Sequence, residues 1–167
     1  LLGEGKHFCA GGDVKSVHLS GPFSELKREF FSKEYSLNLQ IKNFPKPYMS
    51  IWNGVVMGGG VGLSIYGDYR IVTDNTKFAM PETSIGFFPD VGGSFFLAKL
   101  GNNLGKYLGL TGDIVQSKDL LNFNLATHYC PDNKIDNLIN LYIELIHQLG
   151  LNIYQYYFPS LIEKNFH

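Results

Sequence analysis

The segment Met57-Gly58-Gly59-Gly60-Val61-Gly62-Leu63-Ser64 stands between two stretches of different character. Residues 47–53 are apolar and favour a β-strand, whereas residues 61–66 are predicted to form a short buried helix. Peptide N–H groups at the start of a helix attract negative charge, so this glycine turn can hold an oxyanion. Alternatively, the glycines only let a buried helix pack against a sheet. The spacing matches neither GxGxxG nor GxxxxGK[ST], the nucleotide-phosphate fingerprints.

Strands and helices alternate along the rest of the chain. Leu1 and Leu2 are predicted to end a strand that leads into a glycine-rich turn at residues 9–13. Ser24 is a predicted N-cap for a helix that ends at Asn43. One face of this helix is expected to carry its apolar side chains: Leu26, Phe30, Tyr35, Leu37 and Ile41.

The later part of the chain continues the same alternation. Further strands are predicted over 69–73, 77–80 and 127–130. Further helices are predicted over 94–100, 103–110, 117–123 and 132–149, the last of them amphipathic. No element is assigned to residues 150–167. The alternation predicts an α/β architecture without a tandem repeat.

The composition indicates one domain with a packed core. The chain has 167 residues, of which 44% are hydrophobic. Its 14 Lys and Arg balance 15 Asp and Glu, so neither nucleic acid nor an anionic membrane is an expected partner. No apolar run of about 18 residues predicts a membrane span. We expect a single domain over residues 1–167, and because the chain opens on Leu1 instead of Met, we expect this domain to be incomplete at its N-terminus.

The two cysteines and five histidines indicate no metal site. Cys9 and Cys130 have neither disulfide-framework nor CxxC spacing, which fits a reducing compartment. The histidines lack metal-ligand or triad spacing. No targeting segment is visible in the chain.

Two further features of the sequence suit catalytic chemistry. Gly11-Gly12-Asp13 is a second glycine turn, and two such turns can each supply one N–H donor to the oxyanion of a tetrahedral intermediate or an enolate. Glu82 follows Pro81, and Asp90 lies in an apolar loop. Carboxylates in apolar surroundings have raised pKa values, which suits general acid–base catalysis. Alternatively, both carboxylates are ordinary cap or turn residues.

Several motifs, in order and with matching spacing, resemble the crotonase (enoyl-CoA hydratase/isomerase) superfamily. Within it, the motifs are most similar to those of the 3-hydroxyisobutyryl-CoA hydrolases. The resemblance covers roughly residues 1–130 and implies an α/β, crotonase-like spiral of β-β-α units. A full family member is longer, so the resemblance implies that this chain is a truncated portion, incomplete at its C-terminus as well as at its N-terminus. The motifs are Phe8-Cys9-Ala10-Gly11-Gly12-Asp13, Met57 to Ser64, Phe78-Ala79-Met80-Pro81-Glu82 with the loop to Gly93, Leu108 to Gly112, and Ala126-Thr127-His128.

The resemblance implies hydrolysis of an acyl-CoA thioester. The peptide N–H groups of Gly12 and Gly59 would form the oxyanion hole, and Glu82 and Asp90 would be the catalytic carboxylates. Glu34 would contact the substrate, through its 3-hydroxyl group, together with Gly59, Glu82 and Asp90. Glu82 acts either as a nucleophile that forms a mixed anhydride or as a base for water. CoA is part of the substrate, and no cofactor is expected.

The resemblance also implies the substrate 3-hydroxyisobutyryl-CoA, valine catabolism and the mitochondrial matrix. Hydratases of the superfamily carry a second Glu where this chain has Gly62, and typically Gly where it has Asp90. This difference favours the hydrolase over the first alternative, an enoyl-CoA hydratase or isomerase. A second alternative is a non-catalytic crotonase-like subunit, and self-association stays open. Lys15, Lys27, Arg28 and Lys33 are either contacts for CoA phosphates or a solvated helix face.

Overall fold

The computed structural model of the protein describes residues 1–149, so residues 150–167 lie outside it. Its strands are β1 (Met49–Trp52), β2 (Val55–Met57), β3 (Tyr69–Val72), β4 (Lys77–Ala79), β5 (Val115–Gln116) and β6 (His128–Tyr129). Its α-helices are α1 (Val14–Leu19), α2 (Glu25–Lys42), α3 (Gly59–Gly62), α4 (Gly93–Leu97), α5 (Leu104–Thr111), α6 (Ser117–Asn122) and α7 (Ile135–Leu149). Two 3₁₀ turns are η1 (Glu82–Ile85) and η2 (Asp132–Lys134).

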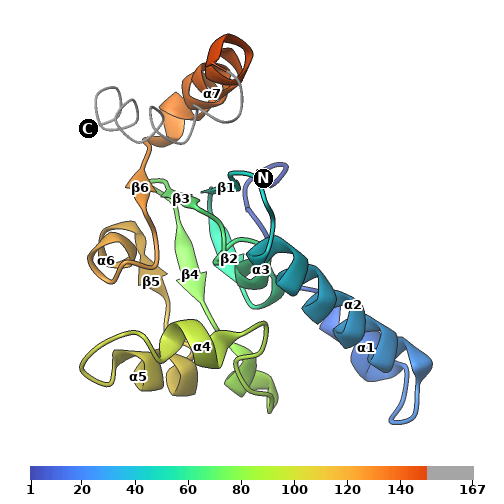
Figure 1. Ribbon diagram of the computed structural model, residues 1–167. Helices are drawn as coiled ribbons and strands as arrows, with labels where there is room; N and C mark the ends of the chain where they lie inside the picture. The colour runs from blue at the N-terminus through green and yellow to red at the C-terminus, as the bar shows by residue number, and fades with distance from the viewer. Residues whose placement is uncertain (150–167) are drawn as a thin grey trace.

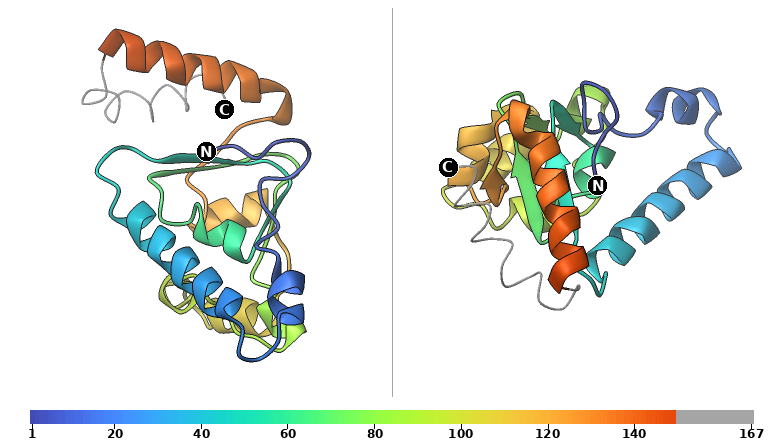
Figure 2. Two further views of the ribbon diagram at one scale, coloured as in Figure 1. Left: turned by 90° about the vertical axis from the view of Figure 1, so that its right-hand side faces the viewer. Right: turned by 90° about the horizontal axis from the view of Figure 1, so that it is seen from above.

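The strands form two three-stranded sheets. The first has the order β1-β3-β6 and is parallel throughout. The second has the order β2-β4-β5, with β2 parallel and β5 antiparallel to β4. Leu2 makes one parallel bridge to Ile51, where a strand end was predicted. Figure 1 shows α4 and α5 at one end of the strands and α7 at the other, and Figure 2 shows α7 as a separate layer there.

Two of these strands were not predicted. The predicted strand over 47–53 corresponds to β1, but the chain then turns at Gly54 and continues as β2 in the other sheet. Gly54 has φ +70°, and a Cβ atom there would lie 2.1 Å from the carbonyl oxygen of Lys6. This turn therefore requires glycine. The second unpredicted strand, β5, has two residues, too few to show an alternating pattern.

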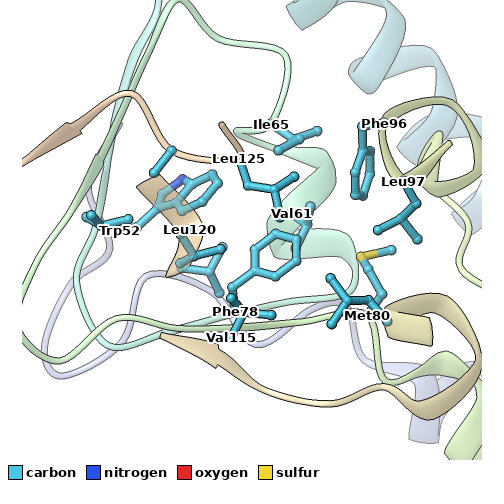
Figure 3. Packing of buried hydrophobic residues seen from close by; sticks show 14 of the residues in the cluster. Trp52, Val61, Ile65, Phe78, Met80, Phe96, Leu97, Val115, Leu120 and Leu125 are labelled. Atoms are coloured by element: carbon cyan, nitrogen blue, oxygen red, sulfur yellow. The ribbon is translucent and has the colours of Figure 1, made fainter. Parts of the chain in front are cut away.

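The main core lies between α3 and the sheets, with Trp52 and Phe78 stacked at a centroid distance of 5.8 Å. Figure 3 shows Val61 of α3 beside Phe78, with Met80 nearby. Both Val61 and Phe78 are almost fully buried. This packing fixes α3, and with it the glycine turn at its start.

A second core lies under α7. The amphipathic helix predicted over 132–149 is confirmed, because its apolar side packs on β1 and β3. Leu138 and Leu145 are buried there among Ile51 and Ile71. No helix within residues 1–149 is long and apolar enough to cross a membrane.

Helix α2 has the predicted bounds, and Ser24 caps it by accepting a hydrogen bond from the Leu26 N–H at 3.1 Å. The predicted apolar face is wrong, since Leu26, Tyr35 and Leu37 are each at least 40% exposed. The one buried side chain of α2 in the described structure is Asn38. Figure 1 shows the reason: α2 extends beside α1 along one side of the strands instead of lying across a sheet.

Helix α1 was not predicted. The second glycine turn leads directly into it, because Asp13 is its N-cap and accepts the Ser16 N–H at 3.0 Å. A Ser, Thr, Asp or Asn cap followed by a helix is a recognised signal. Here the helix is only six residues long and carries one buried residue, Val17, so its hydrophobic pattern is weak.

Candidate active site

A cavity of about 430 Å³ lies between α1, α2, the two glycine turns and the segment from Pro81 to Asp90. All five predicted site residues line it. They come from four segments of the chain and are Gly12, Glu34, Gly59, Glu82 and Asp90. The structure therefore brings together every residue that the sequence singled out for the site.

The two glycine turns lie side by side in this cavity. The Gly12 nitrogen is 3.5 Å from the position that a Cβ atom on Gly59 would take. The Gly59 nitrogen is 3.5 Å from the corresponding position on Gly11. Gly59 is the first residue of α3, so its N–H has no acceptor within the helix. Two amides from separate turns are thus close enough to serve one oxygen atom.

Two carboxylates approach consecutive glycines of the turn that precedes α3. The Oε1 atom of Glu82 lies 3.0 Å from the Cβ position of Gly58, and the Oε1 atom of Glu34 lies 2.5 Å from that of Gly59. Glu82 is 8% exposed, and within the described residues its Oε2 atom has no hydrogen-bond partner. A buried acceptor without a partner is costly, so Glu82 is available to a ligand in the cavity.

The third carboxylate, Asp90, is held by a residue that sequence reasoning missed. The Tyr35 hydroxyl donates a hydrogen bond to Oδ2 of Asp90 at 2.9 Å. Tyr35 was assigned to the apolar face of its helix, although a tyrosine next to Glu34 also carries a polar group at its tip. Its hydrogen bond to Asp90 therefore links α2 to the loop before α4.

Burial and like charge raise the pKa values of the carboxyl groups in this cavity. Burial, with smaller repulsion from Asp90 and Glu34, raises the pKa of Glu82 to about 7. Burial and repulsion from Asp90 raise the pKa of Glu34 to about 7. Burial also raises the pKa of Asp90, although the Tyr35 hydrogen bond opposes the shift. Carboxyl groups with pKa values near neutrality can both accept and return protons at physiological pH.

The raised pKa of Glu82 predicts a pH-dependent stability difference between wild type and Glu82→Gln. An unfolded Glu ionises near pH 4.5, whereas folded Glu82 ionises near 7. Ionisation of Glu82 therefore destabilises the fold. The effect is absent below about pH 4.5, grows between about pH 4.5 and 7, and is complete above about pH 7. Glu82→Gln removes this destabilisation. Calorimetry should find that the variant has the higher Tm at about pH 8 and that its advantage disappears near about pH 4.5. An equal Tm difference at both pH values would contradict the assignment.

Of the four candidate cations, Lys27 lines the cavity. Arg28 and Lys33 instead form ion pairs along α2, with Glu25 at 2.6 Å and Glu29 at 3.0 Å. Lys27 is thus the α2 cation placed to meet an anionic ligand. Within residues 1–149, no group of three or more His, Cys, Asp or Glu side chains is arranged to hold a metal ion.

Gly62 is buried, and atoms of other residues occupy the space that its side chain would need. A Cβ atom there would lie 2.6 Å from the Cβ atom of Val91 and 2.9 Å from Nδ2 of Asn38. Such distances are shorter than van der Waals contact, so a side chain at position 62 would displace both neighbours. A carboxylate therefore cannot be added there without rearrangement.

A family profile described as enoyl-CoA hydratase/isomerase matches residues 1–153. The chain belongs to this family. Curated relatives include the mitochondrial 3-hydroxyisobutyryl-CoA hydrolase of Xenopus tropicalis, 48% identical over 80% of this chain and 35% of that protein. The 3-hydroxyisobutyryl-CoA hydrolase 1 of Arabidopsis thaliana is 46% identical over 83% of this chain and 37% of that protein. The chain thus spans about a third of the length of these relatives.

Solved structures of the enoyl-CoA hydratase/isomerase family match the fold. A carnitinyl-CoA dehydratase from Mycobacterium thermoresistibile is 42% identical, with a TM-score of 0.78 over 89% of this chain and 43% of the other. An enoyl-CoA hydratase from Rhodobacter sphaeroides is 34% identical, with a TM-score of 0.79 over 93% of this chain and 49% of the other. The crotonase-like α/β fold predicted from the motifs is confirmed.

Proposed function

We propose that the protein hydrolyses an acyl-CoA thioester, converting 3-hydroxyisobutyryl-CoA to 3-hydroxyisobutyrate and CoA. One observation carries the proposal: two amide donors from separate turns and three carboxyl groups with raised pKa values line one cavity. The names and identities of the hydrolase relatives support the substrate. CoA enters as part of the substrate, and the proposal requires no cofactor.

In the proposed reaction the thioester oxygen accepts hydrogen bonds from the N–H groups of Gly12 and Gly59. These donors stabilise the negative charge that develops when the carbonyl carbon becomes tetrahedral. The carbon–sulfur bond breaks, an oxygen from water is added to the acyl carbon, and the CoA thiolate takes a proton. Glu82 either attacks the carbon directly or removes a proton from the attacking water.

Asp90 and Glu34 complete the proposed site. Asp90 orients water or the substrate and raises the proton affinity of Glu82 by like charge. Glu34 accepts a hydrogen bond from the 3-hydroxyl group of the acyl chain. A cavity of about 430 Å³ is ample for a branched acyl group of this size.

The second candidate function is hydration or dehydration of an acyl-CoA, which the dehydratase and hydratase structures favour. The geometry at position 62 counts against it. Hydratases place their second Glu there, and in this chain Val91 and Asn38 occupy that space. For this reason we favour hydrolysis over hydration and dehydration.

Relatives named as mitochondrial support a mitochondrial location. We place the protein in the mitochondrial matrix, in valine catabolism. Imaging of the tagged full-length protein tests the location.

The decisive experiment compares two activities of the full-length protein. We expect release of free CoA from 3-hydroxyisobutyryl-CoA to be much faster than hydration of a 2-enoyl-CoA. Faster hydration would support the second candidate instead. Activity in neither assay, from folded protein, would support a non-catalytic subunit.

The Tyr35 hydroxyl is expected to contribute to this activity. Tyr35→Phe removes the donor to Asp90 but keeps the ring, and a hydrogen bond to a charged acceptor contributes about 1.5–3 kcal/mol. We expect kcat for CoA release to fall about tenfold or more, because each 1.4 kcal/mol is a factor of ten. Tyr107→Phe is the control, since its hydroxyl donates to Asp113 outside the cavity. Equal kcat values for the two variants would contradict the role of Tyr35.

A further inference from the structure

The backbone after Asp90 has an unusual conformation. Val91 has φ +42°, a left-handed conformation that is rare for a β-branched residue. Gly92 follows with φ +80°, and the Gly93 N–H donates to the Asp90 carbonyl at 2.6 Å to close the turn. A left-handed valine persists only where its surroundings over-determine it.

Two contacts hold this turn, and both come from the segment of α3. The Tyr66 hydroxyl donates a hydrogen bond to the carbonyl oxygen of Val91 at 2.9 Å. The Val91 side chain is 2% exposed and packs against Gly62. The ring of Tyr66 also fills the space next to Gly92, where a Cβ atom would lie 1.7 Å from the hydroxyl oxygen.

Helix α3 begins at Gly59, so one short segment carries an amide of the oxyanion site at its start and Tyr66 four residues beyond its end. Through Tyr66, this segment is tied to the turn that carries Asp90. The side chain of Asp90 is held from another element, because Tyr35 of α2 donates a hydrogen bond to it. Tyr35 thus holds the side chain of Asp90, and Tyr66 holds the backbone of the next residue, Val91.

We propose that Tyr66 is a positioning residue for Asp90, whose hydroxyl holds the left-handed turn at Val91 and Gly92 in register with the oxyanion amide of Gly59. The proposal rests on the proposed function for its effect on rate. Its structural part does not, because Tyr66 sets where the Asp90 carboxylate lies whichever reaction the cavity performs.

The chain offers a matched control in Tyr48. Its hydroxyl also donates to a backbone carbonyl at 2.9 Å, that of Leu63, which follows α3. Both tyrosines are partly buried, and burial raises the pKa of both, so each hydroxyl keeps its proton. Tyr48 does not line the cavity and does not contact the Asp90 turn through its hydroxyl. Loss of either hydroxyl should reduce thermal stability by a similar amount.

The test compares Tyr66→Phe with Tyr48→Phe in the full-length protein. We expect Tyr66→Phe to lower kcat for CoA release about tenfold with KM within about twofold of wild type, since displacement of a catalytic group by about 1 Å has large effects on rate. Tyr48→Phe should leave kcat within about twofold of wild type, although Tm should fall by a similar amount in both variants. Equal kcat values for the two variants would overturn the proposal.

A second measurement separates this proposal from the proposed function. A crystal structure of Tyr66→Phe should show that the Asp90 carboxylate has left Tyr35, with the oxygen–oxygen distance beyond hydrogen-bond range. If the carboxylate keeps its 2.9 Å contact, Tyr66 does not position Asp90 and the proposal is wrong. This result is independent of which reaction the wild-type protein performs.

Discussion

Glu82→Gln is expected to lower kcat for CoA release by about 10²-fold or more, the lower end of what a positioned acid–base group contributes. The amide keeps the shape of the carboxylate but can neither accept a proton nor attack a thioester. Glu82 is 8% exposed and lies against Gly58 in the turn that supplies the proposed oxyanion donor. Its pKa of about 7 lies near neutral pH, which suits a group that accepts and returns a proton.

The control for this variant is Glu25→Gln. Glu25 is an exposed residue of α2 whose carboxylate pairs with Arg28, so this change removes one negative charge outside the cavity. It should leave kcat unchanged. A Glu82→Gln variant with near-wild-type CoA release would remove Glu82 from the mechanism.

Single-turnover reaction in ¹⁸O-labelled water tests whether Glu82 acts as a nucleophile. A mixed anhydride is opened by water, and label then appears in the Glu82 carboxylate when water attacks its carbonyl carbon. Direct attack of water on the thioester puts label only in the product. Label in the Glu82 carboxylate therefore identifies the mixed anhydride.

The sequence predicted most of the site because its residues lie in short motifs with local physical meaning. Glycine turns before helices and carboxylates in apolar loops follow from composition over a few residues. That Gly12, Glu34 and Glu82 share one cavity depends on strand pairing and helix packing, which spacing alone does not determine. The resemblance to a known family supplied that information.

The features missed by the sequence depend on tertiary context. The apolar residues of α2 predicted a buried face, yet the helix lies along one side of the strands and leaves several of them exposed. Helix α1 and strand β5 are too short to produce a periodic pattern. The left-handed Val91 has no local signal, because its conformation is imposed by Tyr66 and by packing on Gly62.

The second large effect is expected for Asp90→Asn, which should also lower kcat for CoA release by about 10²-fold, since it removes a positioned carboxylate. The Tyr35 hydroxyl can still donate to the amide oxygen, so the loop keeps its anchor. The proposed oxyanion amides and Lys27 are untouched, so KM should change little.

Asp113→Asn is the matched control for this change. Asp113 also accepts a hydrogen bond from a tyrosine hydroxyl, that of Tyr107, but lies outside the cavity. It should retain wild-type activity. A similar loss in both variants would indicate a general effect of removing an aspartate charge instead of a role in the site.

Asp90→Gly tests whether position 90 separates hydrolysis from hydration. This variant should lose most CoA release without gaining hydration of a 2-enoyl-CoA, because the second carboxylate that hydratases use is still absent. Adding Gly62→Glu should not produce hydration either. The Cβ atom of the new side chain would lie only 2.6 Å from the Cβ atom of Val91 and 2.9 Å from Nδ2 of Asn38, so the side chain does not fit there. Overpacking of this kind costs about 1–3 kcal/mol, so the double variant should also have a lower Tm. The ratio of CoA release to enoyl hydration, measured for wild type and both variants, decides the matter. If Asp90→Gly hydrolyses the thioester as fast as wild type, position 90 does not distinguish the two reactions, and the preference for hydrolysis rests on position 62 alone.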